Sequence, residues 1–369
     1  MPKTLIKFSM LALAILFMGA GCVSFSGGGA STAGPVGMFV STDKGEQWQS
    51  ISSLLTEEGL KSIAGVNVYR LFEDPQDAKA MYLASRDNGL FYTYNNGKTW
   101  QQVSDPALSS GFIYALAVHP KNKCIIYATN GRQLFRTDDC SRNWKEMYRE
   151  SRSNVLITSL AFNQFGPYEI YIGQSNGDLM RSYDSGNSWS VIHRFGDRIH
   201  SIVTSPLQEG MSYVITSKNG LYRTDDNATS WVSLKAELSK FSGSLEYRRH
   251  LLHPTDANTF YWISTYGILK SVDRGESWVP YDLIHPPGSA NIYAFAIDPK
   301  NDNNIYYIAT IGNRSTFYKS LDGGKNWITK KLPSGQYPVV LRVHPDNSDI
   351  LYLGFTVPPE SKKQPPKLY

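Results

Sequence analysis

Short runs of mostly apolar residues, each closed by a turn signal, recur along most of this chain. Residues 114–118 run into His119 and Pro120, and residues 125–129 and 133–136 follow after short polar gaps. Runs of four to eight residues that are rich in Val, Ile and aromatic residues predict β-strands rather than helices. The pattern therefore predicts a protein built almost wholly from short antiparallel strands.

One motif, Ser/Thr-x-Asp-x-Gly-x-x-Trp, recurs seven times between these runs, and its tryptophans are 42 to 52 residues apart. Each copy lies between two strand-like runs, so we expect a hairpin turn. A short carboxylate accepts hydrogen bonds from turn amides, Gly tolerates positive φ and Trp packs on the sheet. Ser141 and Ala228 replace the Gly, and Asn95 replaces the Asp. The structural motif residues are Asp43 and Trp48, Asn95 and Trp100, Asp139 and Trp144, Asp184 and Trp189, Asp226 and Trp231, Asp273 and Trp278, and Asp322 and Trp327.

Two further strand-like runs precede most copies of the motif, which gives units of four strands and about 45 residues, the length of a β-propeller blade. The last unit has runs at residues 339–343 and 350–354 but no motif, and only residues 37–40 precede the first motif. If the N-terminal half-unit completes the C-terminal one, the ring closes without exposed sheet edges. We therefore predict an all-β fold, a seven-bladed β-propeller of four-stranded antiparallel blades that N-terminal strands close.

With these repeats the chain resembles the Asp-box (BNR) repeat propellers, which include sialidases, xyloglucanases, sortilin-type receptor domains and the photosystem II assembly factor. The resemblance covers roughly residues 35–356. The Asp/His-Pro turns and the Gly-Leu-Tyr of residues 220–222 are most similar to the xyloglucanase and sortilin branch. The resemblance implies the fold but no single function, because its members include enzymes, receptors and assembly factors.

The first 21 residues have the pattern of a lipoprotein signal peptide. Lys3 and Lys7 precede an apolar run of about 11 residues, shorter than the roughly 20 that span a membrane. The small residues before Cys22 resemble a lipobox, although Gly19 stands where Leu is usual. We expect lipidation of Cys22; the alternative is an ordinary cleaved signal that leaves a free thiol. The predicted order is signal peptide 1–21, flexible tether 22–36, propeller 37–356 and Pro/Lys-rich tail 357–369.

Composition excludes several other classes of protein. The length of 369 residues alone suggests two domains, but seven units of about 45 residues account for it. The 30 Gly, 19 Pro and 23 Tyr oppose an all-helical protein. The net charge of +5 lacks the concentrated basic stripe of a duplex binder, so we expect no nucleic acid partner. Three cysteines are too few for a four-Cys zinc site, and we expect no metal and no cofactor.

Three arginines interrupt otherwise small or apolar positions of the predicted innermost strands. Aligned on the Asp/His-Pro turns, Arg70, Arg249 and Arg342 face the central channel, and Arg248 lies near its mouth. A guanidinium grips carboxylates and phosphates through two parallel hydrogen bonds. The hypothesis is a site for an anion or an acidic peptide. The alternative is that each arginine pairs with a structural carboxylate, such as Glu73 or Glu246.

Cys124 and Cys140 fall in one predicted blade, at the start of its second strand and in the motif that ends its third. Antiparallel pairing brings these two positions together. We predict a disulfide, which suits an exported protein and stabilises it by about 3 kcal/mol.

Connections of variable length indicate that ligands bind on the face opposite the motif turns, because such loops on a rigid scaffold usually carry binding sites. The long connections are residues 52–67, 235–246, 281–291 and 310–316. The loop acids Asp87, Asp178 and Asp197 are candidates for a general acid/base pair, but nothing places two of them at a working distance. No common hydrolase motif occurs. The sequence favours a binding protein over an enzyme without deciding between them.

We expect an extracytoplasmic propeller of the cell envelope, held to the membrane by its lipid anchor. By resemblance to the receptor and assembly-factor relatives, we expect it to bind a protein or peptide as a scaffold or assembly factor. The alternative is a carbohydrate-active protein, either a glycan binder or a glycoside hydrolase related to the sialidase and xyloglucanase propellers. Loop-side aromatic residues leave both interpretations open: Tyr247, Tyr266, Tyr281 and Tyr337.

Overall fold

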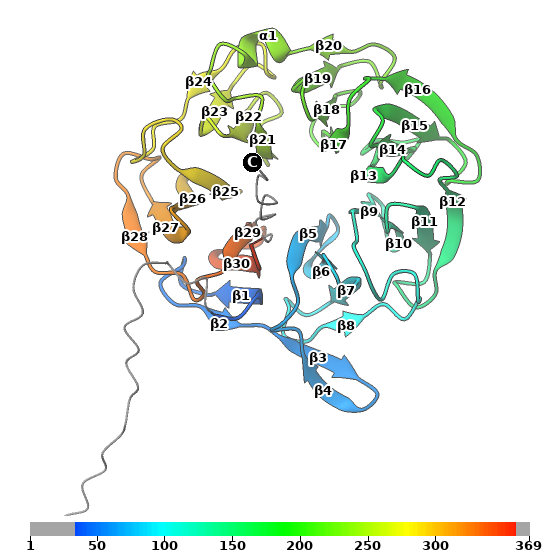
Figure 1. Ribbon diagram of the computed structural model, residues 1–369, viewed down its shortest axis with the longest axis horizontal. Helices are drawn as coiled ribbons and strands as arrows, with labels where there is room; N and C mark the ends of the chain where they lie inside the picture. Colours follow the sequence, from blue (N-terminus) through cyan, green and yellow to red (C-terminus); the bar gives the residue numbers. More distant parts are fainter. Residues whose placement is uncertain (1–33, 359–369) are drawn as a thin grey trace, which may run out of the picture. The chain divides into compact units, whose positions relative to one another are not determined.

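The structure, a computed structural model, describes residues 34–358, which belong to one compact unit. Seven four-stranded antiparallel sheets form the blades of a propeller around a central channel (Figure 1). This architecture confirms the predicted all-β, seven-bladed fold. The signal peptide, Cys22 and the tail beyond Pro358 lie outside the described residues.

In six blades the strands follow one another from the channel outward. Blade 1 contains β5 (Val68–Asp74), β6 (Asp77–Ser85), β7 (Leu90–Thr93) and β8 (Gln101–Gln102); blade 2 contains β9 (Ala115–His119), β10 (Asn122–Thr129), β11 (Gln133–Thr137) and β12 (Lys145–Arg149). Blade 3 contains β13 (Ile157–Phe162), β14 (Ile170–Gln174), β15 (Asp178–Ser182) and β16 (Ser190–Arg194); blade 4 contains β17 (Ile199–Thr204), β18 (Ser212–Thr216), β19 (Leu221–Thr224) and β20 (Val232–Ser233). Blade 5 contains β21 (Tyr247–Leu252), β22 (Phe260–Ser264), β23 (Ile268–Ser271) and β24 (Val279–Pro280); blade 6 contains β25 (Asn291–Asp298), β26 (Asn301–Ile311), β27 (Arg314–Ser320) and β28 (Ile328–Lys330).

Blade 7 combines strands from both ends of the described chain. Its sheet order is β2-β1-β30-β29, with β1 (Gly37–Ser41), β2 (Gln49–Ser50), β29 (Tyr337–His344) and β30 (Asn347–Thr356). β1 runs antiparallel to β30, and Gly37 lies opposite Phe355. The rings of Phe39 and Phe355 meet edge to face with centroids 5.5 Å apart. The ring is thus joined through hydrogen bonds between the first and last strands.

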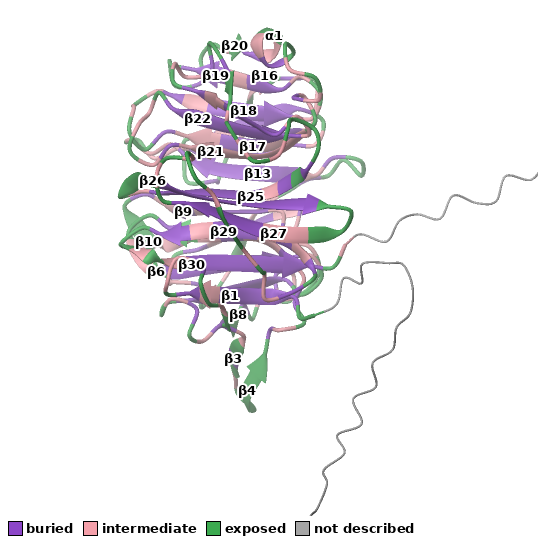
Figure 2. Cartoon of the chain, turned by 90° about the vertical axis from the view of Figure 1, so that its left-hand side faces the viewer, coloured by how far each residue is buried: buried purple, intermediate pink, exposed green. Residues whose placement is uncertain are grey.

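The hydrophobic core consists of seven clusters, each lying between two neighbouring blades. One cluster joins Met38 of blade 7 to Leu71 of blade 1, and another joins Tyr127 of blade 2 to Leu160 of blade 3. Neighbouring blades cover both faces of a middle strand, so β14 is buried along its whole length. Figure 2 shows these buried strands stacked through the ring, with exposed segments at its edges.

Two connections that the sequence predicts as loops contain secondary structure. Residues 52–67 include a hairpin, β3 (Ser53–Thr56) and β4 (Gly59–Ser62), which projects from the rim of the ring (Figure 1). The base of this hairpin covers Trp100, whose backbone amide donates to the Ser53 carbonyl at 2.8 Å. Residues 235–246 begin with the short helix α1 (Lys235–Leu238). Between residues 34 and 358, no helix is long and apolar enough to cross a membrane.

The predicted disulfide is present in blade 2, where Cys124 is bonded to Cys140. It joins the beginning of β10 to the motif turn after β11, two segments that antiparallel pairing already brings together. The bond closes a loop with a sequence separation of 16 residues. A loop of that length corresponds to about 3 kcal/mol of stabilisation.

Candidate ligand-binding channel

The seven motif turns hold six Asp side chains and Asn95 in a repeated set of hydrogen bonds. In each turn the Ser or Thr hydroxyl donates to an Oδ1, as Ser182 donates to Asp184 at 2.8 Å. The same Oδ1 accepts the amide just before the Trp, as it does from Ser188 at 2.8 Å. Both bonds are also present in blade 4, where Ala228 replaces Gly at a φ of 63°. The bonds occupy these carboxylates within the turns.

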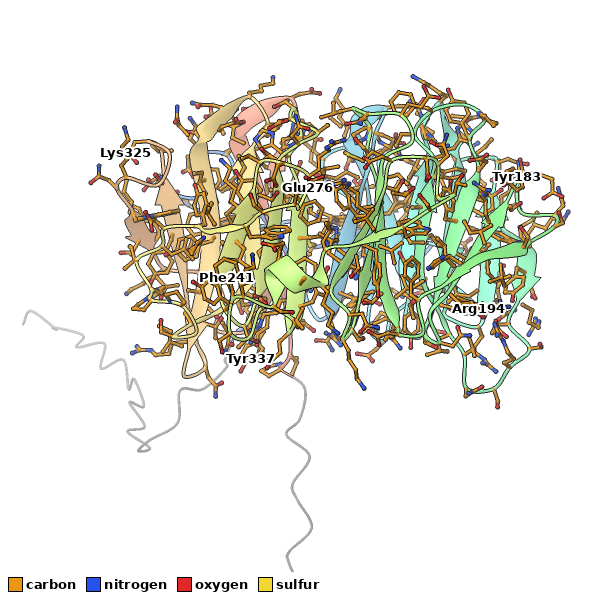
Figure 3. The ribbon with its side chains drawn as sticks, turned by 90° about the horizontal axis from the view of Figure 1, so that it is seen from above. Tyr183, Arg194, Phe241, Glu276, Lys325 and Tyr337 are labelled. Atoms are coloured by element: carbon orange, nitrogen blue, oxygen red, sulfur yellow. A yellow bond between two sulfur atoms is a disulfide. The ribbon has the colours of Figure 1, made fainter. Side chains whose placement is uncertain are left out.

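The motif turns and the longer loops lie on opposite faces of the ring. Figure 3 shows Tyr183, Glu276 and Lys325 from motif turns on one side. Phe241, from a loop, and Tyr337, the first residue of β29, lie on the other side. We call these sides the box face and the loop face. Each inner strand runs from the loop face to a turn at the box face, and in five blades this turn contains Asp-Pro or His-Pro. The first residues of each inner strand therefore lie near the loop-face mouth of the channel.

Arg70, Arg249 and Arg342 line one cavity of about 190 Å³ in the channel. They come from β5, β21 and β29, the inner strands of blades 1, 5 and 7. Arg248 does not line this cavity. Its guanidinium lies 4.9 Å from the centroid of the Tyr293 ring, which does line the cavity. The structure thus brings three predicted residues together and places the fourth beside them.

None of these four arginines forms an ion pair with a carboxylate within residues 34–358. Arg70 donates from Nη2 to the His200 carbonyl at 3.4 Å. Arg249 donates to the carbonyls of Arg248 at 2.8 Å and Val339 at 3.4 Å. Carbonyl oxygens carry no net charge, so these hydrogen bonds leave the arginines of the cavity without an ion-paired carboxylate.

The two carboxylates considered as structural partners do not pair with these arginines. Glu246 accepts a hydrogen bond from the Thr265 hydroxyl at 2.8 Å. Glu73 attracts Arg342 electrostatically but forms no ion pair with it among the described residues. Its side chain is accessible from the channel yet surrounded by protein atoms, and this desolvation raises the pKa of Glu73.

Burial and mutual repulsion shape the charge of the cavity. Burial, followed by the charges of Arg70, Arg342 and Arg249, lowers the pKa of His250 to about 3. Burial, with Arg198 and Arg70 nearby, lowers the pKa of His200 to about 4. Both imidazoles are therefore neutral at pH 7, and the arginines carry the positive charge. Desolvation also lowers the pKa of Arg249, although an arginine still remains charged at neutral pH.

The four loop-side tyrosines have different surroundings. Tyr247 lines the cavity, and its hydroxyl is hydrogen-bonded to His250 Nδ1 at 2.8 Å. Tyr337 stacks on the cavity residue Tyr293 with centroids 6.1 Å apart. Tyr281 packs against the core of blades 5 and 6, whereas Tyr266 packs edge-on against the Phe241 ring. Only the first two belong to the channel.

The three loop acids considered for hydrolysis are engaged in their own loops. Asp178 is paired with Arg152 at 3.1 Å and Arg194 at 3.5 Å. Asp87 accepts from the Asn67 amide group, and Asp197 accepts the backbone amides of residues 218 and 219. None of the three lines the cavity that holds the arginines. Among residues 34–358 no cluster of three His, Cys, Asp or Glu side chains could hold a metal ion.

Some residues in or beside the arginine-lined cavity could not be found by counting alternate positions. In six blades the inner strand pair shifts register near its loop-face end. A bulge of this kind re-aims the side chain of the extra residue. In blades 1, 4 and 6 the residues at the bulge are Tyr69, His200 and Tyr293, and in blade 5 the residue is Arg248.

The repeats, the ring and the channel agree with the comparison to known families. The family model Sortilin-Vps10, described as sortilin, neurotensin receptor 3, matches residues 37–164 and 177–268, more than half of the chain. The chain belongs to the Sortilin-Vps10 family. This assignment is consistent with the Asp-box type of propeller that the motifs predict.

Two proteins that are similar to parts of this chain have names that describe different activities. Xyloglucanase Xgh74A of Acetivibrio thermocellus is 31% identical over 158 residues, which is 37% of this chain and 18% of that enzyme. The photosystem II assembly protein Ycf48 of Thermosynechococcus vestitus is 25% identical over 155 residues, which is 41% of this chain and 40% of that protein. The matched segments thus span less than half of either relative.

A solved structure described as YCF48 bound to D1 peptide has a similar fold. It covers 80% of this Sortilin-Vps10 chain and 94% of its own, with a TM-score of 0.58 and 15% identity. At that identity the likeness shows the fold alone. The homologues include both xyloglucanases and an assembly factor, so the family assignment leaves binding and glycan-directed activity both plausible.

Proposed function

We propose that this Sortilin-Vps10 protein is an extracytoplasmic binding protein that holds an acidic group of a protein or peptide partner in its channel. The observation that carries the proposal is the cavity lined by Arg70, Arg249 and Arg342 without an ion-paired carboxylate. A partner carboxylate placed there gains charge-assisted hydrogen bonds in a site that is already partly desolvated. The peptide bound to the structurally similar YCF48 supports a peptide or protein as the ligand.

A fluorescent hexaglutamate peptide is a direct probe of this site. We expect it to bind the soluble propeller in a salt-dependent manner, whereas hexalysine does not bind. Replacing Arg70, Arg249 and Arg342 together with Gln weakens hexaglutamate binding by about tenfold or more, since each charge-assisted hydrogen bond contributes about 1.5–3 kcal/mol. The matched control is Arg149→Gln, an exposed arginine on β12 that pairs with Glu146. Unchanged binding by the triple variant, with its fold verified by circular dichroism, rules out the proposal.

We also propose that a lipid on Cys22 anchors the protein in the cell envelope. The support is the sequence pattern at residues 1–22 alone. In an envelope fractionation, we expect the wild type in the membrane fraction and a Cys22→Ser variant in the soluble fraction. Recovery of both in the soluble fraction contradicts the anchor.

Glycan binding is the second candidate, and the 31% identity to a xyloglucanase is the observation that favours it. Sugar binding alone needs no acid pair, whereas hydrolysis requires two positioned carboxyl groups. A glycan array therefore separates the two proposals. Binding to an oligosaccharide that survives the triple arginine substitution favours the glycan function over the acidic-peptide function.

A further inference from the structure

The box-face half of the channel contains larger cavities than the arginine-lined half, and one of them differs from it in chemistry. Two adjoining cavities of about 320 and 310 Å³ lie there, and their linings share Glu73, Val203 and His250. The wall of the 320 Å³ cavity is mostly apolar, whereas the 310 Å³ cavity exposes more polar than apolar surface. We call the 320 Å³ cavity the apolar chamber and define it by Val203, Leu251, Leu252, Ile297 and Val343.

The apolar walls of the chamber are partly accessible although they lie at the centre of the ring. Val203, Leu251 and Leu252 are only partly buried. Burial of such side chains is favourable by about 25 cal/mol per Å² of apolar surface. The fold leaves part of this surface exposed, whereas it buries both faces of the middle strands. A ligand that covers it therefore gains affinity without displacing any packing.

The chamber is continuous with the arginine site. His250 and Arg342 line both the 190 Å³ cavity and the 320 Å³ cavity. A ligand in the channel thus meets guanidinium groups on the loop-face side and hydrocarbon on the box-face side. Glu73 is the one carboxylate among the lining residues of these cavities, and it forms no hydrogen bond or ion pair within the described residues.

We propose that the channel binds a single-chain amphiphile with an anionic head, an alkyl carboxylate or alkyl phosphate. The head pairs with Arg342 and the neighbouring arginines, and the hydrocarbon chain fills the apolar chamber. A peptide backbone in the chamber loses hydrogen bonds to water that these apolar walls do not replace, whereas an alkyl chain has none to lose. The proposal shares the arginines with the proposed function, but the chain-binding step rests on the chamber alone.

A chain-length series tests the chamber in the wild-type protein. Hexanoate, octanoate and decanoate are titrated by calorimetry below their micelle concentrations. We expect the affinity to rise about fourfold for each added methylene, because burial of one CH₂ contributes about 0.8 kcal/mol, which corresponds to that fold-change. If the site recognises negative charge, decyl phosphate binds at least as tightly as decanoate. If decyl phosphate binds more weakly than decanoate, the head group of the ligand is a carboxylate. Affinity that is independent of chain length, or equal binding of decylamine, overturns the proposal.

Wall variants separate this proposal from the proposed function. Leu251→Gln and Val203→Gln place an amide in the chamber, and we expect them to remove the chain-length dependence while hexaglutamate binding is retained. Val232→Gln, on the exposed strand β20, is the matched control and leaves both unchanged. If the wild type does not bind hexaglutamate but its affinity for the alkyl carboxylates rises with chain length, only the acidic-peptide function is wrong. If both folded wall variants keep the chain-length dependence of the wild type, only the proposal about the chamber is wrong.

Discussion

Single residues in the motif turns have strongly shifted acidities. The pKa of Asp139 falls to about 2, chiefly because it accepts the backbone amide of Asn143 and then because it accepts the Asn143 side chain. The motif residues Asp184, Asp226 and Asp322 have pKa values lowered to about 2 by similar bonds. A carboxylate that the folded state keeps ionised links stability to pH.

This linkage predicts a loss of stability in acid. The folded pKa of about 2 lies below the ordinary value of 3.8, so the contribution of Asp139 is complete above about pH 4 and is lost as the pH falls toward 2. Asp139→Asn removes the titration, and Asn95 shows that an amide keeps the turn. We expect a smaller drop in the urea midpoint between pH 4.5 and 2.5 for this variant than for the wild type, roughly the window in which the group titrates. Asp282→Asn, an exposed loop substitution that removes no ion pair within the described residues, is the control, and an equal drop in all three proteins contradicts the linkage.

Counting alternate residues back from the Asp/His-Pro turns finds only the channel positions that lie between the turn and the bulge of an inner strand. Arg70, Arg249 and Arg342 are counted back from the Asp/His-Pro turns, and no register shift separates Arg70 or Arg249 from the neighbouring channel positions. Tyr293 and His200 lie at the bulges, where alternation no longer tells which face a side chain takes. A bulge depends on pairing with the neighbouring strand, which one sequence does not display.

At the level of elements, neighbouring blades are connected by basic side chains that precede the motif turns. Arg223 precedes the turn of blade 4 and donates to the Arg274 carbonyl at 3.1 Å and to Glu276 at 3.0 Å, both in the turn of blade 5. Lys319 of blade 6 reaches Glu46 and the Lys44 carbonyl in blade 7. A charge that is almost buried, as Arg223 is, contributes only when its partners satisfy it.

We therefore expect Arg223→Met to destabilise the propeller by about 1–3 kcal/mol, the usual contribution of hydrogen bonds to a charged group. Methionine retains much of the aliphatic packing, so the loss reports the polar contacts. Lys270→Met is the matched control in blade 5, because Lys270 lies over the Tyr261 ring and forms no ion pair within the described residues. Chemical denaturation measures both variants. Equal stability of the Arg223 and Lys270 variants excludes a connecting role for Arg223.

The hairpin β3–β4 is an element that the sequence did not predict. Residues 52–67 lack regular alternation, and both Leu55 and Leu60 are exposed in the hairpin. What stabilises its base is a long-range contact: the Trp100 side chain donates to the Ile51 carbonyl at 2.8 Å. The repeated strands were predictable because each occurs seven times with its turn residues, whereas a single insertion offers one short pattern.

At the scale of the whole molecule, stability depends on closure of the ring. Each of the seven core clusters needs two blades, and two of them need blade 7. Leu353 and Phe355 of β30 are fully buried only while β1 pairs with that strand. Without β1, the edge of β30 offers unpaired amides and carbonyls to other chains.

A chain that starts at residue 46, and so lacks β1, is expected to lose cooperative unfolding and to self-associate at micromolar concentration. Calorimetry and light scattering measure the two effects.

The control is a circular permutant in which a Gly/Ser linker of about ten residues joins residues 358 and 34 and new termini open between Glu57 and Glu58 at the hairpin tip. Gly37 and Phe355 are partners in one sheet, so such a flexible linker reaches easily. The permutant keeps every strand pair and is expected to unfold cooperatively as a monomer. If the truncated chain also stays monomeric with an unchanged melting temperature, pairing between the first and last strands is not what holds the ring closed.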